Sequence, residues 1–115
     1  MEHYSELIAY QKSLNNAVSI CKVTRDFPTY EQYGLANQIR RSSVSIPSNI
    51  AEGFRRGTKE YRQFLKIALS SCSELETQLT IARKLDYVTD DFFKGVYAIN
   101  EEVCKLLVTY LKRLE

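Results

Sequence analysis

Apolar residues recur at alternating spacings of three and four in four separate stretches of this chain. In the first stretch, about residues 5–25, the apolar line consists of Leu7, Tyr10, Leu14, Ala17, Cys21 and Thr24. This spacing places the side chains on one face of an amphipathic helix. The pattern therefore predicts a first helix that packs along this line against a neighbour.

A second helix is predicted to start near Tyr30, because Thr29 and Gln32 have the spacing of a capping box. Its inward line is Ala36, Ile39, Ser43, Ile46, Ile50 and Gly53. Pro47 lies inside this stretch, where it removes a backbone donor and disturbs the preceding turn. Because the apolar spacing continues past Pro47, the pattern favours one helix kinked there. The alternative is a loop between two short helices.

A third helix is predicted after Gly57 and Thr58, with the most regular heptad pattern of the chain. Its inward line is Tyr61, Leu65, Ala68, Cys72, Leu75, Leu79 and Ala82. After a break at residues 86–88, Thr89 is placed to cap a fourth helix, with Asp90 and Asp91 at its positive end. The last inward line is Val96, Ile99, Val103, Leu106 and Tyr110.

Four amphipathic helices joined by short connections must run antiparallel to their sequence neighbours. The sequence therefore predicts an all-α fold, an antiparallel up-down-up-down four-helix bundle. A length of 115 residues fits a single domain spanning residues 1–115. No stretch has the alternation of a β-strand.

Further apolar residues fall outside the inward lines of the third and fourth helices. They are Phe64, Ile67, Leu69 and Ile81 on the third helix and Tyr97, Leu107, Val108 and Leu111 on the fourth. A monomer would expose several of them, and exposed apolar patches mark protein contacts. We therefore expect self-association.

The overall composition is that of a soluble globular protein, with 44% hydrophobic and 26% charged residues. No apolar run is long enough to span a bilayer, and the N-terminus lacks the features of a signal peptide. We therefore expect a cytoplasmic protein without membrane contact. Cys21, Cys72 and Cys104 are widely spaced, so we expect three buried free thiols.

The chain lacks the residue patterns of common catalytic and metal sites. His3 is the only histidine, which excludes a di-iron bundle site built from two Glu-x-x-His motifs. The serines have no neighbouring histidine or GxSxG elbow, and the glycines are isolated rather than gathered in a phosphate-binding loop. We therefore expect no enzymatic activity, no metal and no cofactor.

Basic residues are concentrated in the middle of the chain. The net charge is +2, but residues 40–66 hold seven basic and two acidic residues, a net charge of +5, which leaves −3 elsewhere. The candidate nucleic-acid-binding residues are Arg40, Arg41, Arg55, Arg56, Lys59, Arg62 and Lys66. The helical register predicts that the arginines of the second helix face away from the core. Such side chains bind phosphate well.

Two interpretations of this basic surface stay open. It binds nucleic acid, or it is a solvated helix face with local ion pairs such as Glu52 with Arg56. Nearby aromatic residues add a related question. Phe54, Tyr30 and Tyr33 either stack on unpaired bases or close the ends of the core.

Long segments of the chain resemble a known family. They are FPTYEQYGLANQIRRSSVSIPSNIAEGF, then GTKEYRQFLKIALSSCSELETQL, then LDYV. They are similar to the four-helix-bundle proteins encoded in intervening sequences of 23S rRNA genes, which are related to the accessory protein of diversity-generating retroelements. One departure is Tyr10, near which family members often carry a tryptophan.

The resemblance implies an antiparallel four-helix bundle that forms a ring-like homo-oligomer, a pentamer. The related retroelement branch further implies contact with a reverse transcriptase and with nucleic acid through a basic surface. The favoured hypothesis is thus a non-enzymatic oligomer that binds nucleic acid, RNA above all, through an arginine-rich face. The alternative is an assembly or adaptor protein that docks a protein partner without nucleic acid. It would use the apolar margins above and the polar segment from Ser42 to Asn49.

Overall fold

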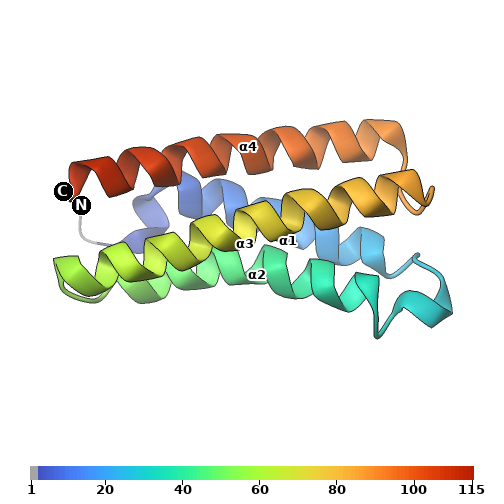
Figure 1. Cartoon of the computed structure of the whole chain (residues 1–115), viewed down its shortest axis with the longest axis horizontal. Coiled ribbons are helices and arrows are strands. Elements are labelled where there is room, and N and C mark those ends of the chain that lie inside the picture. The colour runs from blue at the N-terminus through green and yellow to red at the C-terminus, as the bar shows by residue number, and fades with distance from the viewer. Residues whose placement is uncertain (1–2) are drawn as a thin grey trace.

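The computed structural model describes residues 3–115, which form an elongated bundle of four long helices measuring 42 × 24 × 20 Å (Figure 1). The helices are α1 (Ile8–Thr24), α2 (Leu35–Phe54), α3 (Thr58–Lys84) and α4 (Asp90–Arg113). Short 3₁₀ turns, η1 (Tyr4–Glu6) and η2 (Thr29–Glu31), precede α1 and α2. The described residues contain no strand, so the predicted all-α four-helix bundle is confirmed.

The predicted inward lines of α2 and α3 are confirmed by burial. All six residues of the α2 line are buried, and the α3 line is buried from Leu65 to Ala82, with Tyr61 half-buried at its start. These two helices form the most extensive interface of the bundle. A Cβ atom at Gly53 would lie 2.6 Å from Cβ of Phe64, so glycine is what permits this close approach.

Pro47 lies within the continuous helix α2, so the alternative of a loop between two short helices is wrong. Polar side chains around the proline bond to the backbone of the same helix. Ser48 Oγ donates to the carbonyl oxygen of Val44 at 2.8 Å, and Asn49 Nδ2 donates to that of Ser45 at 2.7 Å. A bend of the helix axis at Pro47 stays a prediction.

The predicted inward line of α1 is wrong at its centre. Leu14 is 40% exposed, and Tyr10 and Cys21 are only half-buried. The buried face of α1 is rotated toward smaller and more polar residues, namely Ala9, Ser13, Asn16, Ala17, Ile20 and Thr24. On α4, similarly, Asn100 and Leu107 are buried while the predicted Ile99, Leu106 and Tyr110 are half-buried.

The second helix begins five residues later than predicted, at Leu35, and the expected capping box is absent. Residues 29–31 form η2 instead. Gln32 points back to the end of α1 and the loop that follows it, where its Nε2 donates to the carbonyl oxygens of Thr24 at 2.9 Å and Phe27 at 3.1 Å. Glu31 supplies the cap, since its Oε1 accepts from the Leu35 amide at 3.2 Å.

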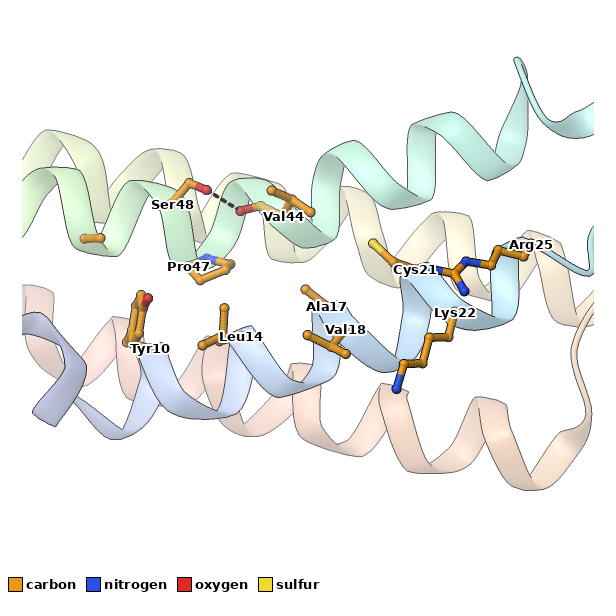
Figure 2. A pocket seen from close by; sticks show the side chains of 11 residues that line it. Tyr10, Leu14, Ala17, Val18, Cys21, Lys22, Arg25, Val44, Pro47 and Ser48 are labelled. Carbon is orange, nitrogen blue, oxygen red and sulfur yellow. Dashed lines mark hydrogen bonds between the residues drawn. The ribbon is translucent and has the colours of Figure 1, made fainter.

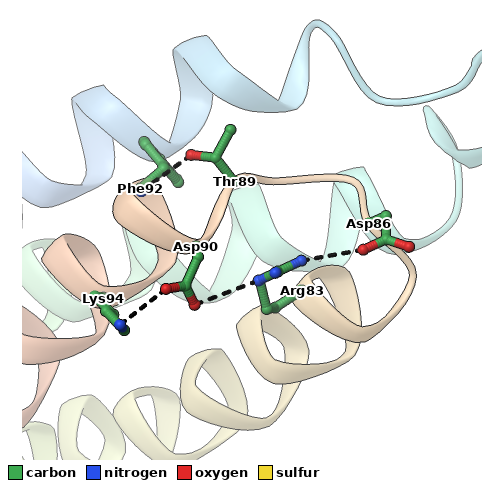
Figure 3. A network of polar contacts seen from close by, with 6 residues as sticks. All are labelled: Arg83, Asp86, Thr89, Asp90, Phe92 and Lys94. Carbon is green, nitrogen blue, oxygen red and sulfur yellow. Dashed lines mark hydrogen bonds and ion pairs between the residues drawn. The ribbon is translucent and has the colours of Figure 1, made fainter.

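The predicted cap of the fourth helix is confirmed. Thr89 Oγ1 accepts a hydrogen bond from the Phe92 amide at 3.1 Å (Figure 3). Arg83, in the last turn of α3, pairs with Asp86 at 3.1 Å and with Asp90 at 3.6 Å. The hydrogen bond from Lys94 and the positive charges of Lys94 and Arg83 lower the pKa of the Asp90 carboxyl. These pairs join the end of α3 to the start of α4.

The three cysteines differ in burial. Cys72 is buried in the core, as predicted, whereas Cys21 and Cys104 are half-buried, so the prediction of three buried thiols is wrong for these two. Burial raises the pKa of the Cys72 thiol to about 12. Within residues 3–115, no helix has the length and apolar character needed to cross a membrane, and no cluster of His, Cys, Asp and Glu suits a metal ion.

Candidate nucleic-acid interface

One end of the bundle is basic because three chain segments meet there. The end of α2, the start of α3 and the end of α4 lie together at the left of Figure 1. With Glu6 of η1, residues 52–66 and 105–115 hold eight lysines and arginines against four glutamates. At the opposite end, residues 22–35 and 83–94 hold five basic and five acidic residues. The positive charge is therefore concentrated at one end.

A stripe of cations runs along the first turns of α3. Lys59, Arg62 and Lys66 are spaced three and four residues apart, so they share one helix face. Arg62 Nη1 donates to the carbonyl oxygen of Leu111 at 3.0 Å, which holds this stripe against the last turn of α4.

The last turn of α4 adds Lys112 and Arg113, which are not among the residues predicted from the sequence. We call the resulting surface the basic end. It consists of Arg55, Lys59, Arg62, Lys66, Lys112 and Arg113. The sequence did carry a signal for the two additional cations. In an antiparallel bundle the end of the fourth helix must lie beside the start of the third.

Arg56 is neutralised by its neighbours. Its guanidinium pairs with Glu52 at 2.5 Å and with Glu60 at 3.1 Å. The hydrogen bonds to Glu52 and Glu60 raise the pKa of Arg56. The same guanidinium lies 5.2 Å from the ring centre of Phe64. The predicted ion pair of Glu52 with Arg56 is confirmed, and with two glutamates beside it the charge of Arg56 contributes little to the basic end.

Arg40 forms hydrogen bonds within the fold. This contradicts the prediction that the arginines of the second helix all face away from the core. Arg40 is half-buried and donates from Nη1 to Thr24 Oγ1 at 3.0 Å and from Nη2 to the carbonyl oxygen of Gln32 at 2.9 Å. The helical register reflects only the packing of helices, whereas the loop at residues 25–34 offers Arg40 the oxygen atoms of Gln32.

Arg41 is exposed but lies far from the basic end. Fourteen residues separate it from Arg55 on α2, which corresponds to about 21 Å along the helix axis. It lines a polar groove between α2 and α3. The structure thus brings Arg55, Arg56, Lys59, Arg62 and Lys66 toward one end of the bundle and leaves Arg40 and Arg41 apart.

The candidate aromatic residues do not form a stacking platform at the basic end. Phe54 packs edge-on against Tyr61, with ring centres 5.9 Å apart, so it closes the end of the core. Tyr30 and Tyr33 are exposed, but they lie in and after η2 at the opposite end of α2. Tyr30 is within hydrogen-bond distance of the Tyr87 hydroxyl, at 3.3 Å.

The polar segment from Ser42 to Asn49, considered above for protein docking, is largely occupied by contacts within the bundle. Ser42 Oγ donates to Gln78 Oε1 at 2.6 Å, and the hydroxyls of Ser45 and Ser71 lie 2.9 Å apart. Both contacts link α2 to α3. The exposed surface available to a partner in this segment is therefore mainly that of Val44 and Ser48.

Comparisons with known proteins agree with this architecture. The family described as 23S rRNA-intervening sequence protein matches residues 5–109. Among solved structures, a protein of unknown function from the S23 ribosomal protein family of Bacteroides thetaiotaomicron is similar, with 30% sequence identity and a TM-score of 0.82. The match covers 91% of this chain and 99% of that one. The search of curated proteins finds no match.

Proposed function

Because the chain belongs to the family of 23S rRNA-intervening sequence proteins, we propose that it is a non-enzymatic, cytoplasmic oligomer that binds RNA through the basic end. The observation that carries this proposal is the gathering of cations from three helices at one end of a bundle whose other end is charge-balanced. A surface of this kind attracts phosphate groups and releases counterions on binding.

The charge of the basic end is available to a ligand. Within residues 3–115, Arg55, Lys59 and Lys66 are exposed and make no ion pair. Arg62 has one guanidinium nitrogen bonded to a backbone carbonyl, which leaves other donors for phosphate. A single copy offers only a few contacts, so assembly of several copies would strengthen RNA binding through avidity.

Support for self-association comes from apolar side chains on the outer face of α3. Ile67 is 40% exposed and Ile81 is 43% exposed, and they lie fourteen residues apart on one face of the helix. Covering such a stripe with another copy would remove apolar area from water. We propose a homo-oligomer on this basis, with the pentamer as the expected number of copies.

Support for a non-catalytic role comes from the buried hydroxyls. Those of Ser13, Thr24 and Ser43 each donate to a carbonyl three residues earlier in their own helix. A nucleophile needs an adjacent base that accepts its proton. These hydroxyls are instead engaged with the backbone.

The test compares two triple variants with the same change in charge. Arg55→Glu, Lys59→Glu and Lys66→Glu alter the basic end, while Lys22→Glu, Arg25→Glu and Lys84→Glu alter exposed cations at the opposite end. Binding to a structured RNA hairpin is measured by filter retention over a series of salt concentrations. Circular dichroism checks the helical content of both variants.

We expect the basic-end variant to lose at least about tenfold in affinity, with a salt dependence shallower by roughly one unit of slope for each phosphate contact removed. The control variant should bind within about twofold of the unaltered protein. Equal losses in both variants would contradict the assigned surface. Absence of salt-sensitive RNA binding in the unaltered protein would favour the alternative of an adaptor that docks a protein partner.

A further inference from the structure

A second surface lies between α1 and α2, and Arg55, at one end of it, is the one residue that it shares with the basic end. It is an open groove of about 440 Å³. Figure 2 shows the apolar side chains from both helices that line it. Its apolar lining includes Tyr10, Leu14, Val18, Cys21, Val44 and Pro47. Pro47 and Val44 come from α2 and face the α1 side chains across the groove.

The distribution of residues on α1 is the opposite of what packing alone would favour. Ser13 and Asn16 are buried, whereas Leu14 is 40% exposed and Val18 is 48% exposed. Across the groove, Val44 is 46% exposed. Fully burying an aliphatic side chain of this size stabilises a fold by about 1.5–3 kcal/mol. Large apolar residues left in water along a groove, while polar ones occupy the core, indicate a surface that another molecule covers.

The two charged residues that line the groove are both positive. Lys22 and Arg25 line one end. At the other end, the Arg55 guanidinium lies 5.2 Å from the ring centre of Tyr4, which packs edge-on against Tyr10. None of the residues that line the groove is an aspartate or glutamate. An occupant with acidic groups at both ends and an apolar middle would complement this surface.

We propose that the groove between α1 and α2 docks an amphipathic helix of a partner protein, one with acidic residues flanking its apolar stripe. The groove follows α1 from Tyr10 to Arg25, about 22 Å, which matches a helix of about four turns. A helix laid in a groove presents apolar anchors at spacings of three and four, and those would meet Leu14, Val18 and Val44. This goes beyond RNA binding, because the anchoring side chains are apolar and lie outside the basic end.

The probe is a fluorescein-labelled helical peptide of about 16 residues. It carries leucines at spacings of three and four, with two glutamates at each end. A second peptide has lysines in place of the glutamates. Fluorescence anisotropy with the full chain should show at least about tenfold tighter binding of the glutamate peptide, because it complements the cations at both ends.

Two matched variants locate the binding surface. Val18→Glu with Val44→Glu places carboxylates in the groove, and Ile8→Glu with Leu85→Glu makes the same change at similarly exposed positions outside the groove. We expect the first variant to lose at least about tenfold in affinity for the glutamate peptide. The second should bind the peptide as the unaltered chain does. Circular dichroism confirms that both variants are helical.

Cys21 provides an independent readout, because it lies in the groove. In a Cys104→Ser variant, bound glutamate peptide should slow alkylation of Cys21 by iodoacetamide. Cys72 is buried and does not compete.

Several results would overturn the proposal. They are equal binding of both peptides, binding unaffected by the groove variant, or alkylation of Cys21 unaffected by the peptide. If neither peptide binds and the groove variant lowers the oligomer mass in solution, the groove belongs to a second copy of the chain. RNA binding by the groove variant is measured separately. This measurement keeps the test of the groove distinct from the test of the basic end.

Discussion

Arg40 donates from Nη1 to the hydroxyl oxygen of Thr24 across 3.0 Å, which joins α2 to the last residue of α1. Thr24 is fully buried, and its hydroxyl proton is donated to the carbonyl oxygen of Cys21 at 2.9 Å. Arg40 also bonds to the carbonyl oxygen of Gln32. One side chain thus holds the end of α1, the loop at residues 25–34 and the second helix together.

Replacement of Arg40 by alanine should destabilise the protein. The loss of charged hydrogen bonds to partly buried partners costs about 1.5–3 kcal/mol. Arg41→Ala is the matched control, because Arg41 is exposed and makes no ion pair within residues 3–115. That change should alter the free energy of unfolding by less than about 0.5 kcal/mol. Urea denaturation followed by circular dichroism measures both, and equal effects would contradict the structural role of Arg40.

Replacement by alanine should destabilise the protein at Gly53 and stabilise it at Gly95. At Gly53 the new Cβ atom would lie 2.6 Å from Cβ of Phe64, so α2 and α3 must separate, at a cost of about 1–3 kcal/mol. At Gly95, inside α4, nothing lies within 4 Å of the new atom. Alanine there should stabilise the helix by about 0.5–1 kcal/mol. Thermal unfolding of the two variants checks the difference in sign, and a stabilised Gly53→Ala variant would contradict the close contact.

Replacement of Asn16 by leucine should stabilise the protein. Asn16 Nδ2 donates to the carbonyl oxygen of Val96 at 3.1 Å, but its Oδ1 is the one buried side-chain polar atom of residues 3–115 without a partner. Leucine removes this orphan oxygen, whose burial costs about 1–3 kcal/mol, and loses the bond to Val96, which contributes about 1 kcal/mol, so the free energy of unfolding should rise by about 1 kcal/mol. Asn100→Leu is the control, since it breaks a buried bond to the carbonyl oxygen of Cys72 and should destabilise. Urea denaturation ranks the two variants, and the reverse order would refute this explanation.

Alkaline pH should weaken the fold partly through Cys72. Burial raises the pKa of its thiol from 9.0 to about 12 in the folded state. Below about pH 9 the Cys72 thiol stays protonated in both the folded and the unfolded chain, so the fold keeps its full stability. Above that pH only the unfolded chain loses the thiol proton, and the free energy of unfolding falls by up to about 1.4 kcal/mol per pH unit until the folded thiol ionises.

A Cys72→Ala variant isolates this contribution. Burial also raises the pKa of Tyr61, which ionises in both proteins, so only the difference in slope reports on the cysteine. Denaturation is measured at several values between about pH 8 and 11. The variant should lose stability less steeply with rising pH than the unaltered protein, and identical slopes would show that the thiol is not protected by burial.

The sequence was a good guide wherever a helix is packed on one face by large apolar residues. The line from Leu65 to Ala82 was predicted correctly because its apolar residues repeat at the helical spacing and few alternatives compete with it. The cap at Thr89 was also correct, since it depends on neighbouring residues alone. The basic residues near the α2–α3 connection were found because they are close in sequence.

Only the tertiary structure could decide how each helix is rotated and which distant groups meet. On α1 two faces offer apolar residues at the helical spacing, and contact with α2 and α4 buries the one with Ala9 and Ile20 while Leu14 is left in the groove. Likewise, Arg40 turns inward because a loop folded from residues 25–34 offers it oxygen atoms, and Lys112 joins the basic end because α4 returns beside α3. The four helices and the inward faces of α2 and α3 were thus determined by local periodicity. The groove and the basic end arise from contacts between residues far apart in the chain, which no local pattern contains.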